Sequence, residues 1–324
     1  MEADAPLDLT GRLMVGLDGL DLTEQDHLRL RQPAVGGVCL FARNYDTTGR
    51  LVRLVKDARA CAGKPLAVGV DHEGGRVQRF VGEGFPPIAA PRTLGAAYER
   101  SREAAISEAV ERGGAMAQQL RAVDIDFTFA PSLDIDYGRN PMIDSRCFAA
   151  DPEGVAALGL AFCQGLHEHG MIAIGKHFPG HGWAKADTHL EVAVDDRSLD
   201  DLLAADLRPY VELFAAGMLD AVLVAHVHCR ELAAKPSTYA PEIIEDLLRG
   251  RLGFGGMVMT DDLVMEGADI GLDMVERTLA ARRAGCDLLL WCGGEPVLLD
   301  DALAELPAAG GVAAPWQDLL AKRS

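Results

Sequence analysis

Eight short apolar runs recur along the chain, separated by longer stretches whose apolar residues fall at helical spacing. This alternation is typical of βα units around a parallel sheet, because strands covered on both faces are apolar nearly throughout. Eight such units predict a closed (β/α)8 barrel, the TIM barrel of the α/β class. The runs are Leu13–Leu17, Gly37–Phe41, Leu66–Val70, Asp126–Ala130, Met171–Gly175, Ala221–Ala225, Met257–Thr260 and Cys286–Trp291.

The stretches between the runs carry the signals of helices. Thr23 and Asp26 have the spacing of a capping pair, and Pro33 ends that helix before the second run. Gly82–Pro91 is interpreted as a loop over the active face, and Pro307–Pro315 as a turn before a last short helix. Further helices are expected at Pro152–Glu168, Ser198–Ala216, Pro241–Leu252 and Asp273–Ala284.

The length and composition fit one large domain. Barrels of this kind commonly reach the size of this 324-residue chain around a single core. Hydrophobic residues make up 49% and charged residues 25%, which is the balance of a globular enzyme. Because no linker-like stretch divides the chain, we expect residues 1–324 to form a single catalytic domain, active as a monomer.

The net charge of −18 argues against anionic partners. An acidic surface repels nucleic acid phosphates and anionic membrane surfaces, and no basic run offsets it. Glu2 and Asp4 stand where a secretory signal would carry basic residues, and no apolar stretch is long enough to span a membrane. We therefore expect a cytoplasmic protein without a nucleic acid or membrane partner.

The seven cysteines form no CxxC pair, and several lie inside the apolar runs. In a reducing compartment an odd number of such cysteines indicates buried free thiols. The sequence has no glycine-rich nucleotide loop in the right context and no thiolate cluster, so no cofactor is expected.

Polar residues follow nearly every run, at the edge of a barrel where catalytic groups sit. So many ionisable groups in a ring must be paired or functional. Trp291, Cys292 and Gly293 follow the eighth run, where they could supply an apolar wall for a sugar ring. The ring comprises Arg43, Asn44, Asp71, Glu73, Asp134, Asp136, Lys176, His177, His226, His228, Asp261 and Asp262.

The stretch after the fifth run carries a candidate proton-transfer pair. Its glycines and proline, from Lys176 to Gly182, indicate a shaped loop that leads to Asp187 and His189. In an extended segment residues two apart point the same way, so Asp187 can hold the His189 imidazole in one tautomer. An acid that orients an imidazole is what general acid/base catalysis requires.

These segments resemble the glycoside hydrolase family 3 β-N-acetylglucosaminidases of bacterial cell-wall recycling, over nearly the whole chain. Three motifs carry most of the resemblance: 70–80 (VDHEGGRVQRF), 176–182 (KHFPGHG) with Asp187-Thr188-His189, and 259–267 (MTDDLVMEG). Residues 130–135 and 143–148 are also similar to family segments. His72 stands where glutamine is common in the family. The Asp-x-His element separates this branch from family 3 β-glucosidases, which typically draw their acid from a second domain.

The resemblance implies a retaining mechanism without a cofactor. Asp261 would be the nucleophile, Asp262 would be structural, and the pair Asp187 and His189 would be the acid/base. A sugar-binding pocket would be formed by Asp71, Arg79, Arg146, Lys176 and His177. Asp261 would attack the anomeric carbon while His189 protonates the leaving oxygen, and water would then open the glycosyl-enzyme with retention of configuration.

The substrate implied by the resemblance is a muropeptide fragment with terminal non-reducing N-acetylglucosamine. A neutral histidine repels anions less than a carboxylate does, so phosphate also fits as the acceptor and would make the enzyme a phosphorylase. A family 3 β-glucosidase and a sugar-binding protein without turnover are further alternatives. A metal-dependent barrel hydrolase is a different class, in which His177, His181, His226 and His228 would converge on an ion.

Overall fold

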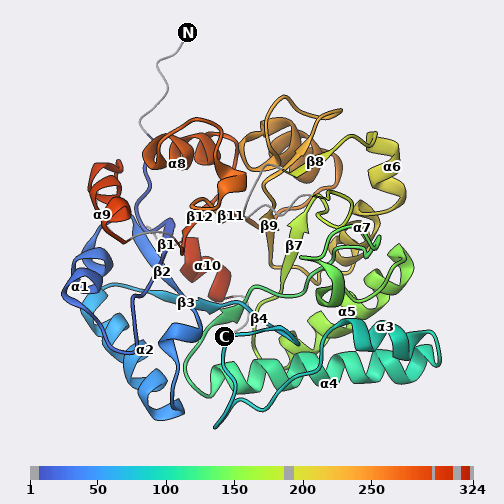
Figure 1. Ribbon diagram of the computed structural model, residues 1–324, viewed down its shortest axis with the longest axis horizontal. Coiled ribbons are helices and arrows are strands. Elements are labelled where there is room, and N and C mark those ends of the chain that lie inside the picture. Colours follow the sequence, from blue (N-terminus) through green and yellow to red (C-terminus); the bar gives the residue numbers. More distant parts are fainter. Residues whose placement is uncertain (1–6, 186–192, 294–295, 309–314, 322–324) are drawn as a thin grey trace.

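The eight apolar runs form the strands of one parallel sheet in the computed structural model, which describes residues 7–185, 193–293, 296–308 and 315–321 (Figure 1). Every pair of neighbouring strands in the sheet is parallel, so the predicted barrel is confirmed. The order is β6 (Phe127–Thr128), β3 (Ala67–Val70), β2 (Val35–Leu40), β1 (Leu13–Gly16), β12 (Leu288–Trp291), β11 (Met257–Asp262), β9 (Ala221–Val224) and β7 (Ile174–Phe178).

Backbone contacts between the fourth and fifth strands close the ring. β6 and β7 stand at the two ends of the strand order, and the Ile174 N–H donates to the Ala130 carbonyl at 2.9 Å. A little further along, the Leu133 N–H donates to the Lys176 carbonyl at 2.6 Å. This second bond lies where the strands end, so it fixes the fourth-strand loop against the start of the fifth-strand loop.

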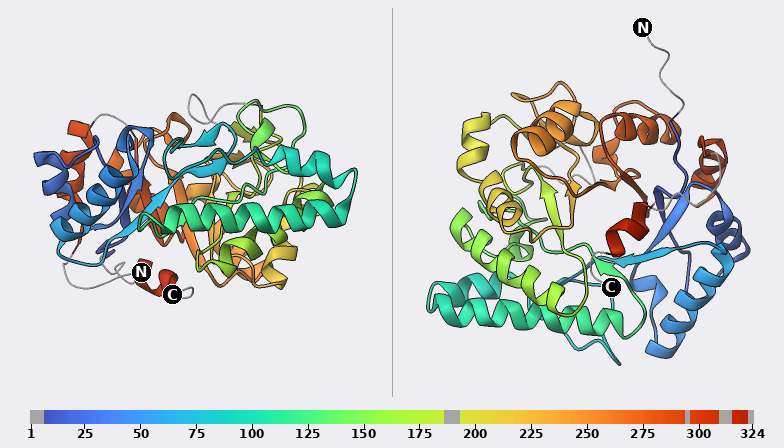
Figure 2. Two further views of the ribbon diagram at one scale, coloured as in Figure 1. Left: turned by 90° about the horizontal axis from the view of Figure 1, so that it is seen from below. Right: turned by 180° about the vertical axis from the view of Figure 1, so that it is seen from behind.

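Helices surround the barrel, as Figures 1 and 2 show. The predicted capping pair is confirmed, since Thr23 forms a capping box with Asp26 at the start of α1. α5 has the predicted bounds, and α8 begins after Asp273, which forms a capping box with Glu276. No described helix is long and apolar enough to cross a membrane. The helices are α1 (Glu24–Arg31), α2 (Thr48–Ala62), α3 (Arg92–Tyr98), α4 (Arg102–Arg121), α5 (Pro152–Glu168), α6 (Leu199–Ala204), α7 (Leu207–Ala215), η4 (Glu242–Arg251), α8 (Met274–Arg283), α9 (Pro296–Glu305) and α10 (Pro315–Leu320), with short turns η1 (Ala42–Asn44), η2 (Asp144–Arg146), η3 (Ser237–Tyr239) and η5 (Glu266–Ala268).

The single helix predicted over Ser198–Ala216 is wrong, because the structure has two. α6 ends at Ala204, Ala205 leaves the helical region with φ −127° and ψ −92°, and α7 begins at Leu207. Pro209 explains the break, since in one continuous helix its ring would clash with the carbonyl of residue 205 and remove a hydrogen bond. In the first turn of α7 the same proline leaves no helical bond unmade.

Two small sheets lie beside the barrel and were not predicted. β4 (His72–Gly74) and β5 (Val77–Gln78) pair antiparallel directly after the third strand. β8 (Ala193–Asp195) and β10 (Val227–Cys229) pair parallel after the fifth and sixth strands. Both lengthen loops that follow barrel strands.

Residues 82–91 form an irregular segment, as predicted for Gly82–Pro91. It packs beside the start of α2, where the Tyr45 hydroxyl donates to the Glu83 carbonyl at 2.7 Å. None of its residues is among those that line the pocket described below.

α10 covers the end of the barrel opposite the β4–β5 hairpin (Figure 2). The indole of Trp316 is 2% exposed and stacks on Phe127 inside the barrel, with ring centroids 5.4 Å apart and planes at 8°. Leu319 is fully buried in the same cluster. The barrel interior is thus filled by side chains and is not a pore, and its polar groups are confined to the opposite end.

The Trp316→Ala substitution is expected to lower the free energy of unfolding by about 3–5 kcal/mol, because it removes a buried aromatic ring and leaves a cavity. Trp316→Phe should cost much less, since it keeps the stacked ring and removes an indole N–H that has no hydrogen-bond partner among the described residues. Urea unfolding measures both values. A surface control is Leu28→Ala, where the side chain is 57% exposed. Equal losses for the alanine and phenylalanine variants would contradict the packing role.

Candidate active site

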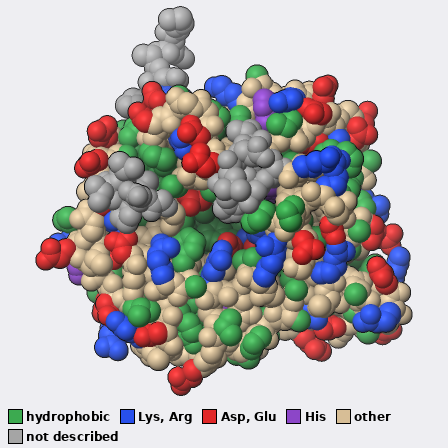
Figure 3. Space-filling model, in the orientation of Figure 1, with side chains coloured by type: hydrophobic (Ala, Val, Ile, Leu, Met, Phe, Trp, Pro, Cys, Tyr) green, Lys and Arg blue, Asp and Glu red, His purple; other side chains and the backbone are tan. Residues whose placement is uncertain are grey.

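A pocket of about 440 Å³ opens where the barrel strands end. Figure 3 shows a hollow in this face with Lys and Arg side chains gathered in a band beside it. Five predicted sugar-binding residues and the predicted nucleophile come together here from strands far apart in the sequence. These lining residues are Asp71, Arg79, Arg146, Lys176, His177 and Asp261.

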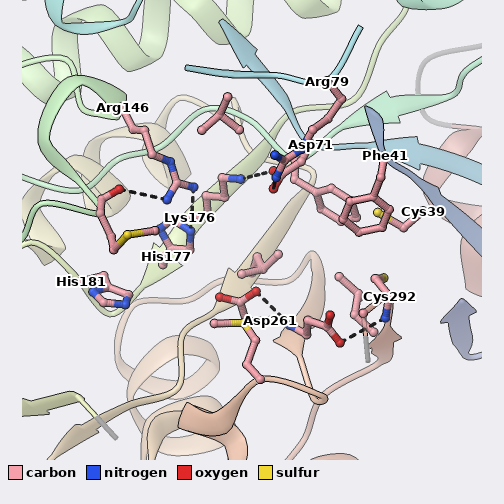
Figure 4. Close-up of a pocket in the computed structure, with 18 of the residues that line it drawn as sticks. Cys39, Phe41, Asp71, Arg79, Arg146, Lys176, His177, His181, Asp261 and Cys292 are labelled. Atoms are coloured by element: carbon pink, nitrogen blue, oxygen red, sulfur yellow. Dashed lines mark hydrogen bonds and ion pairs between the residues drawn. The ribbon is translucent and has the colours of Figure 1, made fainter. Parts of the chain in front are cut away.

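Two buried cations and two carboxylates form one network on the pocket wall (Figure 4). Lys176 lies 2.6 Å from Asp71 and 2.5 Å from Glu73. Arg146 donates to both carboxylate oxygens of Glu73, through Nε at 2.9 Å and Nη2 at 2.7 Å. Arg79 adds a second cation to Asp71 at 3.1 Å. Because each charge has a partner, the network can remain ionised with little solvent.

The charges of this network set the ionisation of its members. Burial alone would raise the pKa of Asp71, but Lys176, Arg79 and Arg146 lower it well below its ordinary value. Burial likewise opposes ionisation of Glu73, yet Arg146 and Lys176 hold its pKa below the usual range. Asp71 is therefore a carboxylate that can accept hydrogen bonds from hydroxyl groups in the pocket.

Asp134 orients two pocket histidines from the loop after the fourth strand. It receives the Nδ1–H of His177 at 2.6 Å and the backbone N–H of His181 at 2.8 Å. Since Arg146 can only donate, the 3.3 Å contact between its Nη2 and His177 Nε2 makes Nε2 the acceptor. Asn140 donates to Nδ1 of His181 at 2.9 Å, which places the His181 proton on Nε2. Both imidazoles are thus held in one tautomer each.

Asp261 is the penultimate residue of β11 and lines the pocket (Figure 4). Burial opposes its ionisation, but His177, His226, the backbone N–H of Asp262 and Lys176 together lower its pKa. Its Oδ1 accepts the backbone N–H of Asp262 at 2.8 Å. An ionised carboxylate in this position can act as a nucleophile toward a carbon bound in the pocket.

The neighbouring Asp262 has a different environment. Its Oδ1 accepts the backbone N–H groups of Val264 and Cys292, both at 3.1 Å. Burial, with the charge of Asp261 added to it, raises the pKa of Asp262 to about 6. Asp262 therefore ties the seventh-strand loop to the end of β12, and this is the structural role that was expected of it.

The remaining predicted ring residues do not line the pocket. Asn44 donates to the carbonyls of Leu17 and Gly19, at 3.2 and 2.7 Å, and so joins two loops. Asp136 pairs with Arg92 outside the pocket. The guanidinium of Arg43 lies over the ring of Phe41, 4.5 Å from its centroid. Arg43 itself does not line the pocket.

The apolar wall of the pocket differs in part from the predicted one. Cys292 and Gly293 line it, but Trp291 does not, and its indole N–H donates to Thr278 of α8 at 2.9 Å. The physical reason is alternation along the strand, which turns Trp291 outward where Leu290 and Cys292 face inward. Phe41, the last residue of the second apolar run, supplies the aromatic ring instead. Its position at a strand end was the signal that could have identified it.

The histidines proposed as metal ligands have other partners. His226 lies 2.8 Å from the Thr238 hydroxyl and 3.0 Å from the Asp262 carbonyl. His228 lies 3.0 Å from the Ala233 carbonyl. No group of three or more His, Cys, Asp or Glu side chains suited to hold a metal ion occurs within the described part of the chain. The convergence that a metal hydrolase would need is therefore not found among these histidines.

All seven cysteines are free thiols, as predicted. Cys39 and Cys292 lie in the pocket wall, and the other five are elsewhere. The proposed acid/base residues, Asp187 and His189, lie outside the described residues.

The fold and the pocket define a class: a (β/α)8-barrel enzyme with an ionised carboxylate facing a pocket built to bind hydroxyl groups. Residues 13–315 match the family model described as the glycosyl hydrolase family 3 N terminal domain. The chain belongs to glycosyl hydrolase family 3 and is a glycoside hydrolase.

Relatives named beta-hexosaminidase share much of the sequence. The one from Bordetella avium is 47% identical over 91% of this chain and 84% of its own length. The one from Tolumonas auensis is 46% identical over 92% of this chain and 88% of its own length. The solved structure of NagZ from Neisseria gonorrhoeae has a TM-score of 0.88 and 37% identity, covering 97% of this chain and 91% of that one.

His72, next to the pocket carboxylate Asp71, is enclosed without hydrogen bonds to its ring. It is fully buried against Phe80 and Phe85, and neither ring nitrogen has a partner in the described structure. Burial lowers the pKa of His72 from 6.5 to about 4. The unfolded chain therefore takes up this proton at a higher pH than the folded chain does.

This difference predicts that acid weakens the fold through His72. Between pH 6.5 and about 4 the unfolded state binds the extra proton, so the free energy of unfolding falls as the pH falls. His72→Phe removes the titrating group, and relative to wild type it should gain about 3 kcal/mol between pH 7 and pH 4. Urea unfolding across this range measures the gain. Parallel pH curves for the two proteins would contradict the prediction.

Proposed function

We propose that this glycoside hydrolase is a retaining β-N-acetylglucosaminidase that removes terminal non-reducing N-acetylglucosamine. The observation that carries the proposal is the ionised Asp261 at the end of β11, facing a wall of paired charges. A nucleophile must be ionised at the start of the reaction, and a sugar ring needs several charged groups that can bind its hydroxyls.

The comparisons support the substrate class. The relatives from Bordetella avium and Tolumonas auensis are both named beta-hexosaminidase. The Neisseria gonorrhoeae protein has also been solved in complex with N-trifluoroacetyl-D-glucosamine, again with a TM-score of 0.88. The binding of a 2-acylamino sugar by the Neisseria gonorrhoeae protein supports the same sugar class here.

The wall of the pocket would position the sugar for attack. Asp71, kept ionised by Lys176 and Arg79, accepts hydrogen bonds from hydroxyls, while the two cations donate to the same hydroxyls. His177 is fixed between Asp134 and Arg146 and contributes a directed contact. Holding the ring in this way would bring its anomeric carbon to Asp261, and such positioning supplies a large part of the rate.

The proton is assigned to Asp187 and His189. Among the described pocket carboxylates other than Asp261, Asp71 is engaged by two cations, and Asp262 accepts backbone N–H groups. Neither can approach a leaving oxygen without giving up these partners. An imidazole has an unperturbed pKa near 6.5 and is suited to transfer a proton near neutral pH. His189 would protonate the leaving oxygen and later deprotonate the attacking water.

The proposed natural substrate, cellular location and oligomeric state follow from the family resemblance. The substrate would be a peptidoglycan-derived muropeptide bearing N-acetylglucosamine, processed in the cytoplasm by a monomer whose residues 1–324 act as one catalytic domain. The acidic net charge of −18 favours neither a nucleic acid nor a membrane as partner.

Release of nitrophenol from the β-N-acetylglucosaminide tests the proposal. Asp261→Asn is expected to lower kcat/KM by at least about 10³-fold, because the amide cannot form the glycosyl-enzyme. The matched control is Asp262→Asn, whose amide oxygen still accepts the two backbone N–H groups, and it should lose no more than about tenfold. His189→Ala should lose about 10²- to 10⁴-fold on a substrate whose leaving group needs protonation.

Assays on a second substrate and in the presence of a chelator distinguish the β-glucosidase and metal-hydrolase alternatives. The β-glucoside should be turned over far more slowly than the N-acetyl substrate, and a chelator should leave the rate unchanged. Preference for the glucoside would overturn the substrate assignment. Chelator-sensitive activity that survives Asp261→Asn would overturn the mechanism in favour of a metal hydrolase.

A further inference from the structure

Two arginines contact the indole ring of Trp183, in the loop after the fifth strand. The guanidinium of Arg139 stands 3.8 Å from the centroid of its ring, and that of Arg197 stands 4.7 Å away. Tyr137 packs edge-on against the indole at 5.2 Å and 89°. A cation over an indole face is attracted by the ring electrons. These four residues are called the Trp183 clamp below.

The Arg197 side of the clamp is fixed by buried carboxylates. Arg197 binds Asp195 through Nε at 3.0 Å and Nη2 at 2.6 Å, and binds Asp206 through Nη1 at 2.6 Å. Tyr137 donates its hydroxyl proton to the same Asp206 oxygen at 2.7 Å. Asp195 and Asp206 are each 1% exposed, so moving Arg197 away would leave two buried charges unpaired.

The Trp183 side is fixed to the loop after the fourth strand. A Cβ on Gly182 would lie 1.9 Å from the Ile135 carbonyl oxygen, so only glycine allows this close approach. The preceding His181 donates its backbone N–H to Asp134, the carboxylate that also holds His177. These contacts fix the fifth-strand loop between the pocket and Trp183. Figure 4 shows the part of this loop at the pocket, with His177 and His181.

The contact between Trp183 and Arg197 joins two points that flank the proposed proton-transfer pair. Trp183 precedes Asp187 by four residues, and Arg197 follows His189 by eight. In general, a contact that joins two points of a chain reduces the number of conformations open to the residues between them. Transition-state geometry is demanding, and a misplacement of about 1 Å can cost about 10²-fold in rate.

We propose that the Trp183 clamp is a positioning device for proton transfer, acting through Asp187 and His189 without touching the substrate. This inference rests on the proposed function, since it assumes that the pair protonates the leaving oxygen. It assigns a role to Trp183, Arg197, Tyr137 and Arg139, none of which lines the pocket. The proposal predicts that loss of the clamp lowers kcat/KM more for a substrate whose leaving group must be protonated than for one whose leaving group departs as an anion.

The test compares two N-acetylglucosaminides that differ in leaving group. Dinitrophenolate departs without protonation, whereas the sugar alcohol of N,N′-diacetylchitobiose requires an acid. Trp183→Ala is expected to lower kcat/KM about 10²-fold on diacetylchitobiose and no more than about threefold on the dinitrophenyl substrate. Trp183→Phe keeps an aromatic face for the two arginines to contact and should recover most of the loss.

A double variant shows whether the clamp acts through His189. If it does, Trp183→Ala should cost little further activity on diacetylchitobiose once His189 is already alanine. Full additivity of the two losses would overturn the proposal, and so would equal losses on both substrates, which indicate general damage to the pocket. A matched surface control is Arg230→Ala, where the side chain is 58% exposed and 3.7 Å from Asp196, and it should behave as wild type.

The failures of the two proposals are distinguishable. If His189→Ala shows the leaving-group-dependent loss and folded Trp183→Ala does not, the clamp is wrong and the proposed function stands. If His189→Ala itself shows no such dependence, the acid/base assignment is wrong, and the clamp proposal falls with it. Thermal unfolding checks that Trp183→Ala is folded. If Trp183→Ala is less stable than wild type, the activities of Trp183→Phe and of the double variant decide whether the clamp acts through His189.

Discussion

The pairing of buried charge at the carboxyl ends of the strands is the constraint on which the site depends. Lys176 has 3% of its side chain exposed, and it can be charged there only because Asp71 and Glu73 lie within 2.6 Å. Glu73 in turn requires Arg146. Removing one partner would leave an uncompensated charge in a nearly dry environment, so each member holds the others in place. The wall that is proposed to bind the sugar is thus held in place by its own ion pairs.

A second set of contacts fixes the fifth-strand loop from the pocket to Trp183. Asp134 connects His177, on the pocket wall, to His181 in the fifth-strand loop. The same loop continues to Trp183, whose ring contacts the guanidinium groups of Arg139 and Arg197. The closure of the barrel between the fourth and fifth strands makes the two loops neighbours. One arrangement of backbone therefore supports both the binding of the sugar and the ends of the segment assigned to proton transfer.

Much of the fold and of the site could be predicted because a parallel barrel has a simple physical pattern. Strands buried on both faces are apolar throughout, and polar residues after them meet at one end, which is how Asp71, Lys176 and Asp261 were found. The pattern does not say which face a strand-end residue takes, so Trp291 was placed in the wall that Phe41 forms. It also does not separate Asp134, which orients histidines, from Asp136, which pairs with Arg92 outside the pocket. Those roles depend on contacts between loops distant in sequence, as do the partners of Trp183.

The central claim is that Asp261 forms a covalent bond to the sugar, and trapping that intermediate tests it most directly. A slow fluorinated N-acetylglucosaminyl substrate would be incubated with the enzyme, followed by intact mass measurement and peptide mapping. The account predicts one added glycosyl group, located on the peptide that contains Asp261 and absent from the Asp261→Asn variant. A glycosyl group on another carboxylate, or turnover that releases the inverted α-anomer without any adduct, would contradict it.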